Sequence, residues 1–366
     1  MQSTLSRSLI STLTIENAIE IAAIDYGEAE EIFNHLLSTD NLDQQIIDQP
    51  SLAKGFQDTL HAALSEAFGQ DSPDPTALLF TQRILYRINR LNLFWYDDLQ
   101  NYTNERSLFL AAIRDRIETA WQSWELAQSD VSALQNEDVE TGLNRRADLD
   151  LNPPLSSDAR FMREEMSEAG YRHLLAIASF DGLIEASRLS RILGGAANEM
   201  QCTLVRVLLE EYGNGRLSRK HSTFFAEMMT EMGLNTQPEG YFKIVPWEVF
   251  ASINHNFLLT ERKRHFLRYN GGLTYFEIAG PSIYQNYLAA AQRLNLSDTA
   301  MGYWELHIRE DERHGRWMLG DVALPLAQQY PDQAWEILLG YDQEKYMGDR
   351  AGAAVVRSIR NMEGIS

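Results

Sequence analysis

The chain has 366 residues and a mass of 41.8 kDa, which at usual domain sizes suggests about two domains. Asp and Glu number 52 against 32 Lys and Arg, so the net charge is −20 and nucleic acid is not expected as a partner. The single cysteine, Cys202, excludes an intrachain disulfide and a cysteine-ligated zinc or iron–sulfur site. No apolar run is long enough for a signal core or a membrane span, so we expect a soluble, cytoplasmic protein that does not bind membranes.

The first part of the chain is predicted to be helical. Residues 1–150 hold 25 acidic and 10 basic residues, whereas residues 151–366 hold 27 and 22, so the two parts differ in charge. We predict an N-terminal helical domain over residues 1–128 whose apolar stripe packs against another surface, most simply the second subunit of a homodimer. The stripe includes apolar residues spaced by three or four positions, as on one face of a helix: Ile84, Ile88, Leu91 and Trp95.

A polar stretch over residues 129–157 ends at Pro153-Pro154, where a helix cannot continue, and is predicted to be a linker. The best strand candidate, 241–245, is short and closed by Pro246, so the predicted fold class is all-α. One or two short helices are expected near the C-terminus. Before them, the domain over residues 158–366 is expected to hold helices at about 158–194, 196–212, 218–232, 246–269, 273–294 and 299–319.

The residues most indicative of chemistry are His307, Asp311 and His314. Their spacing of i, i+4 and i+7 places them within about 60° of one another on a helix. Two imidazoles and a carboxylate on one stripe suit iron or manganese better than a structural zinc site, since no cysteine cluster is available. A solvated charged face is the competing interpretation, and we favour metal ligation.

Three further segments each hold a candidate ligand. Glu211 and His221 lie ten residues apart and would not share a face of a straight helix, but Gly213 and Gly215 between them can break it. Glu277 and Glu185 both stand among apolar residues, where a carboxylate is costly unless it is paired or binds a metal. Each segment alone also fits an ordinary turn or a surface position. Together, carboxylates and histidines from several helices of a bundle are how two irons are held.

The order and intervals of these residues resemble the heme-oxygenase-like diiron oxidases, specifically from about residue 171 to residue 319. The resemblance implies a helical bundle that holds two Fe(II) ions. In it Glu211 bridges or chelates, His221 and His314 serve one iron, and the other iron is served mainly by Glu277, His307 and Asp311. Glu185 occupies the place of an additional carboxylate ligand in the N-oxygenating branch of that family.

The resemblance implies an O2-dependent monooxygenase that transfers oxygen to an amine or guanidine nitrogen of a small, amino-acid-derived metabolite in natural-product biosynthesis. No flavin or iron–sulfur motif is evident, so an electron-donor protein or a small reductant is also implied. A diiron oxidase that cleaves C–C bonds or desaturates an amino or fatty acid is the alternative enzyme, and Glu185 favours N-oxygenation. A metal-free helical binding protein is the alternative from a different class.

Overall fold

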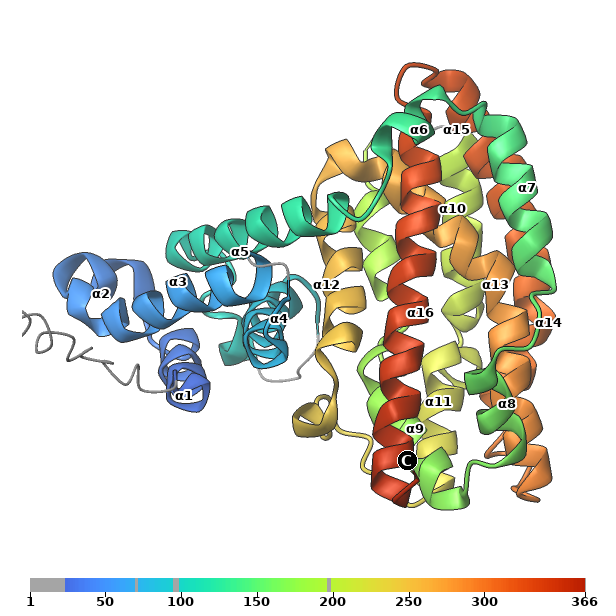
Figure 1. Ribbon diagram of the computed structural model, residues 1–366, viewed down its shortest axis with the longest axis horizontal. Helices are drawn as coiled ribbons and strands as arrows, with labels where there is room; N and C mark the ends of the chain where they lie inside the picture. Colours follow the sequence, from blue (N-terminus) through green and yellow to red (C-terminus); the bar gives the residue numbers. More distant parts are fainter. Residues whose placement is uncertain (1–23, 70–71, 95–98, 196–198, 366) are drawn as a thin grey trace, which may run out of the picture.

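The computed structural model describes residues 24–69, 72–94, 99–195 and 199–365, which contain helices and no strand (Figure 1). This confirms the all-α prediction. No helix of the described chain is long and apolar enough to cross a membrane. In chain order the α-helices are α1 (Tyr26–Leu37), α2 (Leu42–Asp48), α3 (Lys54–Phe68), α4 (Pro75–Asn89), α5 (Leu108–Leu126), α6 (Val131–Asn136), α7 (Val139–Leu151), α8 (Ser157–Glu164), α9 (Glu168–Gly182), α10 (Glu199–Glu211), α11 (His221–Glu231), α12 (Trp247–Glu261), α13 (Phe266–Arg293), α14 (Gly302–Trp317), α15 (Leu324–Gln329) and α16 (Trp335–Glu363).

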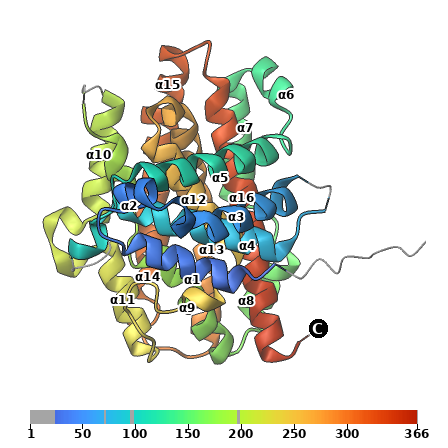
Figure 2. The ribbon, with the colours of Figure 1, turned by 90° about the vertical axis from the view of Figure 1, so that its left-hand side faces the viewer.

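The N-terminal helices α1 to α5 lie together on one side of a larger bundle, and α4 packs against α12 of that bundle (Figures 1 and 2). A buried amide network crosses this contact, because Asn254 of α12 lies 3.1 Å from Asn89 and donates to the side-chain oxygen of Gln82 at 2.9 Å. These hydrogen bonds join buried side chains of both helices, so they help to fix how α4 sits on α12.

The apolar stripe of α4 is covered by its own chain. Ile84 and Ile88 are buried, as is Leu91 in the turn that follows, within a core that includes α1, α3, α5 and Ala251 of α12. The expectation that a second subunit covers the stripe is therefore wrong for these three residues. Trp95 lies outside the described residues.

The segment predicted to be a linker is partly helical instead. Residues 129–157 contain α6 and α7, which begin with side-chain caps: Asp130 accepts from the amide of Ala133, and Asp138 from that of Thr141, each at 2.9 Å. Only a narrow face of α7 is buried, so the polar composition that suggested a linker belongs to its solvent face.

The helical segments of the bundle also differ in length from the prediction. The helix expected over 158–194 is divided into α8 and α9, and α9 ends at Gly182. Of the short helices expected near the C-terminus, α15 has six residues, but the last helix, α16, is long, with 29 residues. The strand candidate forms a 3₁₀ turn, Phe242–Ile244. The first residues of the helix predicted over 196–212 lie outside the described chain.

Helices α13 and α16 form the centre of the bundle and cross at two glycines. Separate helices were expected over 246–269 and 273–294, with a break at residues 270–272, yet α13 runs through Gly271 and Gly272. A Cβ added to Gly271 would lie 2.0 Å from the carbonyl oxygen of Ile337, and one added to Gly340 would lie 1.9 Å from that of Arg268. The glycines therefore allow two backbones to touch, and the close crossing sets the position of Glu277 farther along α13.

Candidate metal centre

The seven candidate ligands all lie in the interior of the bundle, and each is at most 9% exposed. Three come from successive turns of α14, where Asp311 is 1% exposed and His314 is fully covered. The others come from four separate places in the chain. They are Glu185 in the turn after α9, Glu211 at the end of α10, His221 at the start of α11 and Glu277 in α13.

The turn between α10 and α11 brings Glu211 and His221 together. Gly213, Asn214 and Gly215 all have positive φ, between 54° and 79°, which reverses the chain directly after Glu211. A Cβ on Gly213 would lie 2.4 Å from the backbone carbon of Arg219, so this residue must be glycine. The predicted glycine break between the two ligands is confirmed.

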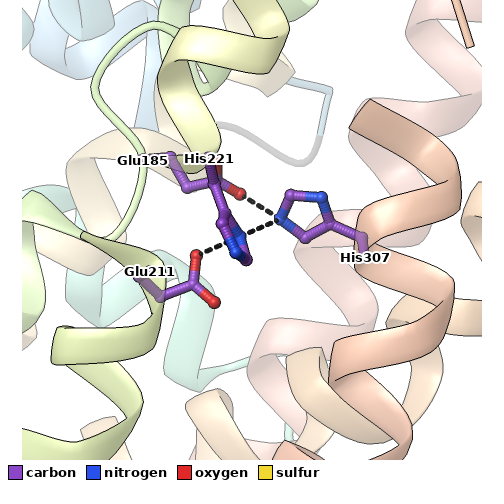
Figure 3. A group of neighbouring side chains, drawn as sticks. All are labelled: Glu185, Glu211, His221 and His307. Atoms are coloured by element: carbon purple, nitrogen blue, oxygen red, sulfur yellow. Dashed lines mark hydrogen bonds and ion pairs between the residues drawn. The ribbon is translucent and has the colours of Figure 1, made fainter. Parts of the chain in front are cut away.

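Four of the residues form the first group of potential ligand atoms, drawn in Figure 3. The Nε2 atom of His307 lies 2.7 Å from Oε1 of Glu185 and 3.1 Å from Nδ1 of His221. Nδ1 of His221 lies 2.8 Å from Oε2 of Glu211. Two imidazole nitrogens and two carboxylate oxygens from four segments therefore converge on one point.

The second group shares Glu211 with the first and adds two residues of α14, Asp311 and His314. Nδ1 of His314 lies 3.5 Å from Oε1 of Glu211 and 4.0 Å from Oδ1 of Asp311. Glu277 lies on the same side, with its Oε2 3.3 Å from the same nitrogen. Glu211 thus directs one oxygen to each group, as a bridging carboxylate does in a two-metal site.

The structure divides the residues differently from the resemblance. His221 was expected to share an iron with His314, and His307 with Asp311 and Glu277. Instead, His221 lies beside His307, with ring centroids 4.6 Å apart, while Asp311, Glu277 and His314 gather around the other oxygen of Glu211. The cause is the direction in which α11 approaches α14, which no spacing within one helix determines.

Two histidines have the second ring nitrogen fixed by a residue outside the seven. Nδ1 of His307 lies 2.8 Å from the backbone oxygen of Tyr303, which can only accept, so this nitrogen carries the proton and Nε2 is free to bind a metal. Nε2 of His314 donates to the carboxylate of Glu210 at 2.9 Å, which leaves Nδ1 facing the second group. Arg313 holds Glu210 at 2.6 Å. Such partners orient metal-bound imidazoles.

Roles for Glu210 and Tyr303 were not predicted from the sequence. The Tyr303 hydroxyl donates to Oε1 of Glu185 at 2.7 Å and so orients that carboxylate. Glu210 precedes Glu211, and consecutive residues on a helix point about 100° apart, so only the position of α14 beside α10 shows that both face His314. Tyr303 stands one turn before His307, a spacing that could have suggested a contact with the ligand stripe.

The electrostatics of the cluster show an excess of buried carboxylates. Burial would lower the pKa of His314, but the carboxylates of Glu277, Glu211 and Glu210 raise it to about 10. Burial, together with the charge of Glu277, raises the pKa of Asp311 well above its usual value. Burial likewise raises the pKa of Glu277. Four carboxylates and three imidazoles in one dry pocket therefore favour added positive charge, carried by protons or by metal ions.

The donor set fits two divalent ions such as iron. Several buried atoms of the candidate ligands have no hydrogen-bond partner among the described residues, as expected of atoms that bind a metal. These atoms are Oε2 of Glu185, Oδ2 of Asp311 and Nδ1 of His314. Carboxylates combined with imidazoles, without thiolates, are the donor set of non-heme iron sites. Residues 185, 211, 221 and 307 can hold one ion, and residues 211, 277, 311 and 314 the other.

Comparison with known proteins agrees with this geometry. Residues 172–343 match the family model described as iron-containing redox enzyme. A nitrosourea synthase from Streptomyces achromogenes subsp. streptozoticus is 28% identical over 158 residues, which is 42% of this chain. The match spans about a third of that relative's length, 32%. Residues 172–343 therefore resemble the iron-containing redox enzymes, and this match supports an oxidoreductase with the heme-oxygenase-like helical fold.

Proposed function

We propose that this chain is an O2-dependent non-heme diiron monooxygenase that transfers oxygen to an amine or guanidine nitrogen of a small metabolite. The observation that carries the proposal is Glu211, whose two carboxylate oxygens face two separate groups of ligand atoms. A shared carboxylate between two sets of nitrogen and oxygen donors is the arrangement of a two-metal centre. The nitrosourea synthase to which the chain is similar supports chemistry at nitrogen.

Bound iron would supply the activation of O2, and the chain's residues position the reactants. The hydroxyl of Tyr303 holds Glu185 in place, because it donates to Oε1 at 2.7 Å. The other oxygen, Oε2, is buried and has no hydrogen-bond partner among the described residues. Glu185 is the residue that favours nitrogen oxygenation, because it would add a carboxylate to the residues that hold one iron and would thereby raise the negative charge around it.

The centre is enclosed, which keeps water away from the reaction. Tyr284 and Tyr303 pack against the ring of His307, with centroid distances of 5.1 Å and 4.2 Å, and Trp304 packs against Tyr303. All three aromatic residues are at most 8% exposed. A dry, shaped cavity beside the metal ligands is what the protein contributes to such chemistry.

We also propose that a donor protein or a small reductant supplies electrons, and that the product serves natural-product biosynthesis.

The test of the metal centre is anaerobic loading with Fe(II), followed by iron analysis and measurement of oxygen uptake. The wild-type chain should bind two irons and consume O2 when a reductant is present. His307→Ala, Asp311→Ala and His314→Ala should each abolish iron-dependent uptake with far-UV helicity nearly unchanged, because a bundle of this size tolerates the loss of one ligand. His61→Ala, at an exposed position of α3, is the matched control and should behave as wild type.

The test of nitrogen oxygenation is a screen of amines and guanidines with isotopically labelled O2, with products read by mass spectrometry. Label should appear on nitrogen with the wild-type chain. Glu185→Ala should retain iron and lose this transfer. Two outcomes would contradict the proposal: a chain that holds no iron after anaerobic loading, or labelled oxygen found only on carbon.

A further inference from the structure

A cavity of about 180 Å³ extends from the metal centre into the bundle between α9, α10, α12, α13, α14 and α16. Five of the seven candidate ligands line one part of it: Glu185, Glu211, Glu277, His307 and Asp311. The cavity is large enough for several water molecules or a small metabolite. Its walls are mainly apolar, with Ile177, Leu189 and Ile253 among them. A substrate that reaches the ligands would lie along these walls.

The remaining polar residues of this cavity are Asp181, Arg188, Asn256, Tyr269 and Glu344, with Ser252 on α12. Arg188 forms an ion pair with Asp181, to which its guanidinium donates a short hydrogen bond. Within the described part of the chain, the only hydrogen-bond partner of Glu344 on α16 is the amide of Asn256, whose Nδ2 lies 3.3 Å from each carboxylate oxygen. Among the described residues no Lys, Arg or His nitrogen lies within 4.0 Å of Glu344 in an ion pair.

Glu344 is half-buried, and a carboxylate partly removed from water is unfavourable without a cation or several hydrogen bonds. Burial raises the pKa of Glu344 to about 7, although the nearby charge of Arg188 opposes the shift. The backbone makes room for the group, because a Cβ on Gly272 would lie 3.3 Å from Oε2 of Glu344. The structure therefore places an unmatched acid against an apolar cavity that leads to the metal ligands.

The position of Glu344 also indicates how far this carboxylate lies from the metal centre. It lies beside Gly272 on α13, and the candidate ligand Glu277 follows five residues later on the same helix. At 1.5 Å per residue the two positions are about 7.5 Å apart along the helix axis. An extended small metabolite can bridge that distance with one end at Glu344 and the other at the centre.

We propose that Glu344 binds a cationic amino or guanidino group of the substrate, and that the cavity thereby selects molecules carrying a positive charge at the end remote from the atom to be oxidised. The apolar walls then contact the aliphatic part of the substrate. Asn256 keeps the carboxylate oriented, and Arg188 stays paired with Asp181. This inference rests on the proposed function only in taking the cavity as the place where substrate meets the metal centre.

The test compares two ligands of the same shape that differ in charge, n-butylguanidine and n-butylurea. Binding is measured by titration calorimetry on the Fe(II)-loaded chain without O2, so no turnover occurs. Wild type should bind the guanidine more tightly than the urea. Glu344→Gln should weaken guanidine binding at least about tenfold, the loss expected for a charge-assisted hydrogen bond, and leave urea binding unchanged. Asp349→Asn, an exposed position on the same helix, should change neither.

Glu344→Asp keeps the charge and should retain the preference for the guanidine, which separates a charge effect from a disturbed fold. Equal binding of the two ligands by wild type, or full guanidine affinity in Glu344→Gln, would overturn the inference. These results are distinguishable from failure of the proposed function, because calorimetry does not depend on oxygen transfer. Oxygen uptake that persists with a neutral substrate would leave the function standing and remove the role of Glu344.

Discussion

His307 and His314 each use one ring nitrogen for a partner outside the cluster and direct the other into it. The partner of His307 is a backbone carbonyl of its own helix, whereas the partner of His314 is the side chain of Glu210 on α10. A mutation of Glu210 can remove its contact with His314 without changing any residue of α14. Glu210 therefore allows the orientation of a metal-binding imidazole to be tested separately from its presence.

Glu210→Gln is expected to lower iron affinity at the second group by about 10- to 100-fold, the usual cost of losing such a partner. The amide cannot accept as strongly from His314 Nε2 and so leaves Nδ1 a weaker donor to metal. Competition with a chelator measures the change. Glu310→Gln is the control, because Glu310 also contacts Arg313 but not His314. Equal affinities in the two variants would show that Glu210 has no role in metal binding.

Metal loading should also release protons. In the metal-free chain the pKa of His314 is raised to about 10, so this imidazole carries a proton at neutral pH that a metal ion must displace. Iron affinity should therefore increase as pH rises from 6.5 toward 10. In the metal-free chain the same raised pKa adds stability below pH 6.5 that is lost as pH rises through about 10. Calorimetry in buffers of different ionisation enthalpy counts the released protons, and His314→Ala should release fewer.

At the scale of elements, the crossing of α13 and α16 depends on glycines that meet backbone rather than side chains. Gly340→Ala should destabilise the chain by about 3 kcal/mol or more, since its Cβ would overlap the carbonyl oxygen of Arg268 and neither helix can shift freely. Gly352→Ala, on the same helix with nothing within 4 Å, should instead stabilise it by about 0.5–1 kcal/mol. Chemical denaturation followed by circular dichroism measures both. Similar stabilities for the two variants would contradict the close crossing.

The same glycines explain which elements could be predicted from sequence. The stripe at 307, 311 and 314 was visible because its spacing lies within one helix. The length of α16 could not be predicted, because Gly340, Gly348 and Gly352 lower the local helix propensity. Packing against α13 compensates for this loss. The break expected at Gly271 failed for the same reason. Helices α6 and α7 were hidden by the polar residues of their exposed faces.

For the candidate site, the residue set could be named from sequence but its division could not. All seven residues lie together in the structure. They could be named from the sequence because carboxylates and histidines among apolar residues are few in this chain. Which histidine lies beside which carboxylate depends on the rotation of α10, α11 and α13 about α14. Glu210 and Tyr303 were missed since their roles exist only once those helices are placed.

At the scale of the whole molecule, the N-terminal helices expose large apolar side chains although their own core is complete. The most exposed include Ile47 (71%) in α2 and Leu108 (77%) at the start of α5. We expect these helices to form a homodimer, with sedimentation at micromolar concentration showing twice the chain mass. Leu108→Arg should shift the equilibrium toward monomer, whereas Leu149→Arg, 64% exposed on α7, should not. A wild-type chain that sediments as a monomer would contradict the predicted homodimer.

The sharing of Glu211 between the two groups couples their occupancy. In the absence of ions, the two oxygens of Glu211 lie among other carboxylates and imidazoles. Fixing the Glu211 carboxylate in one position has a cost in side-chain entropy. The first ion bears that cost for both groups. The second then binds to a donor that is already immobilised, so filling should be cooperative, with a sigmoidal titration curve. The centre would then pass directly from empty to doubly filled, and a singly loaded form would never accumulate.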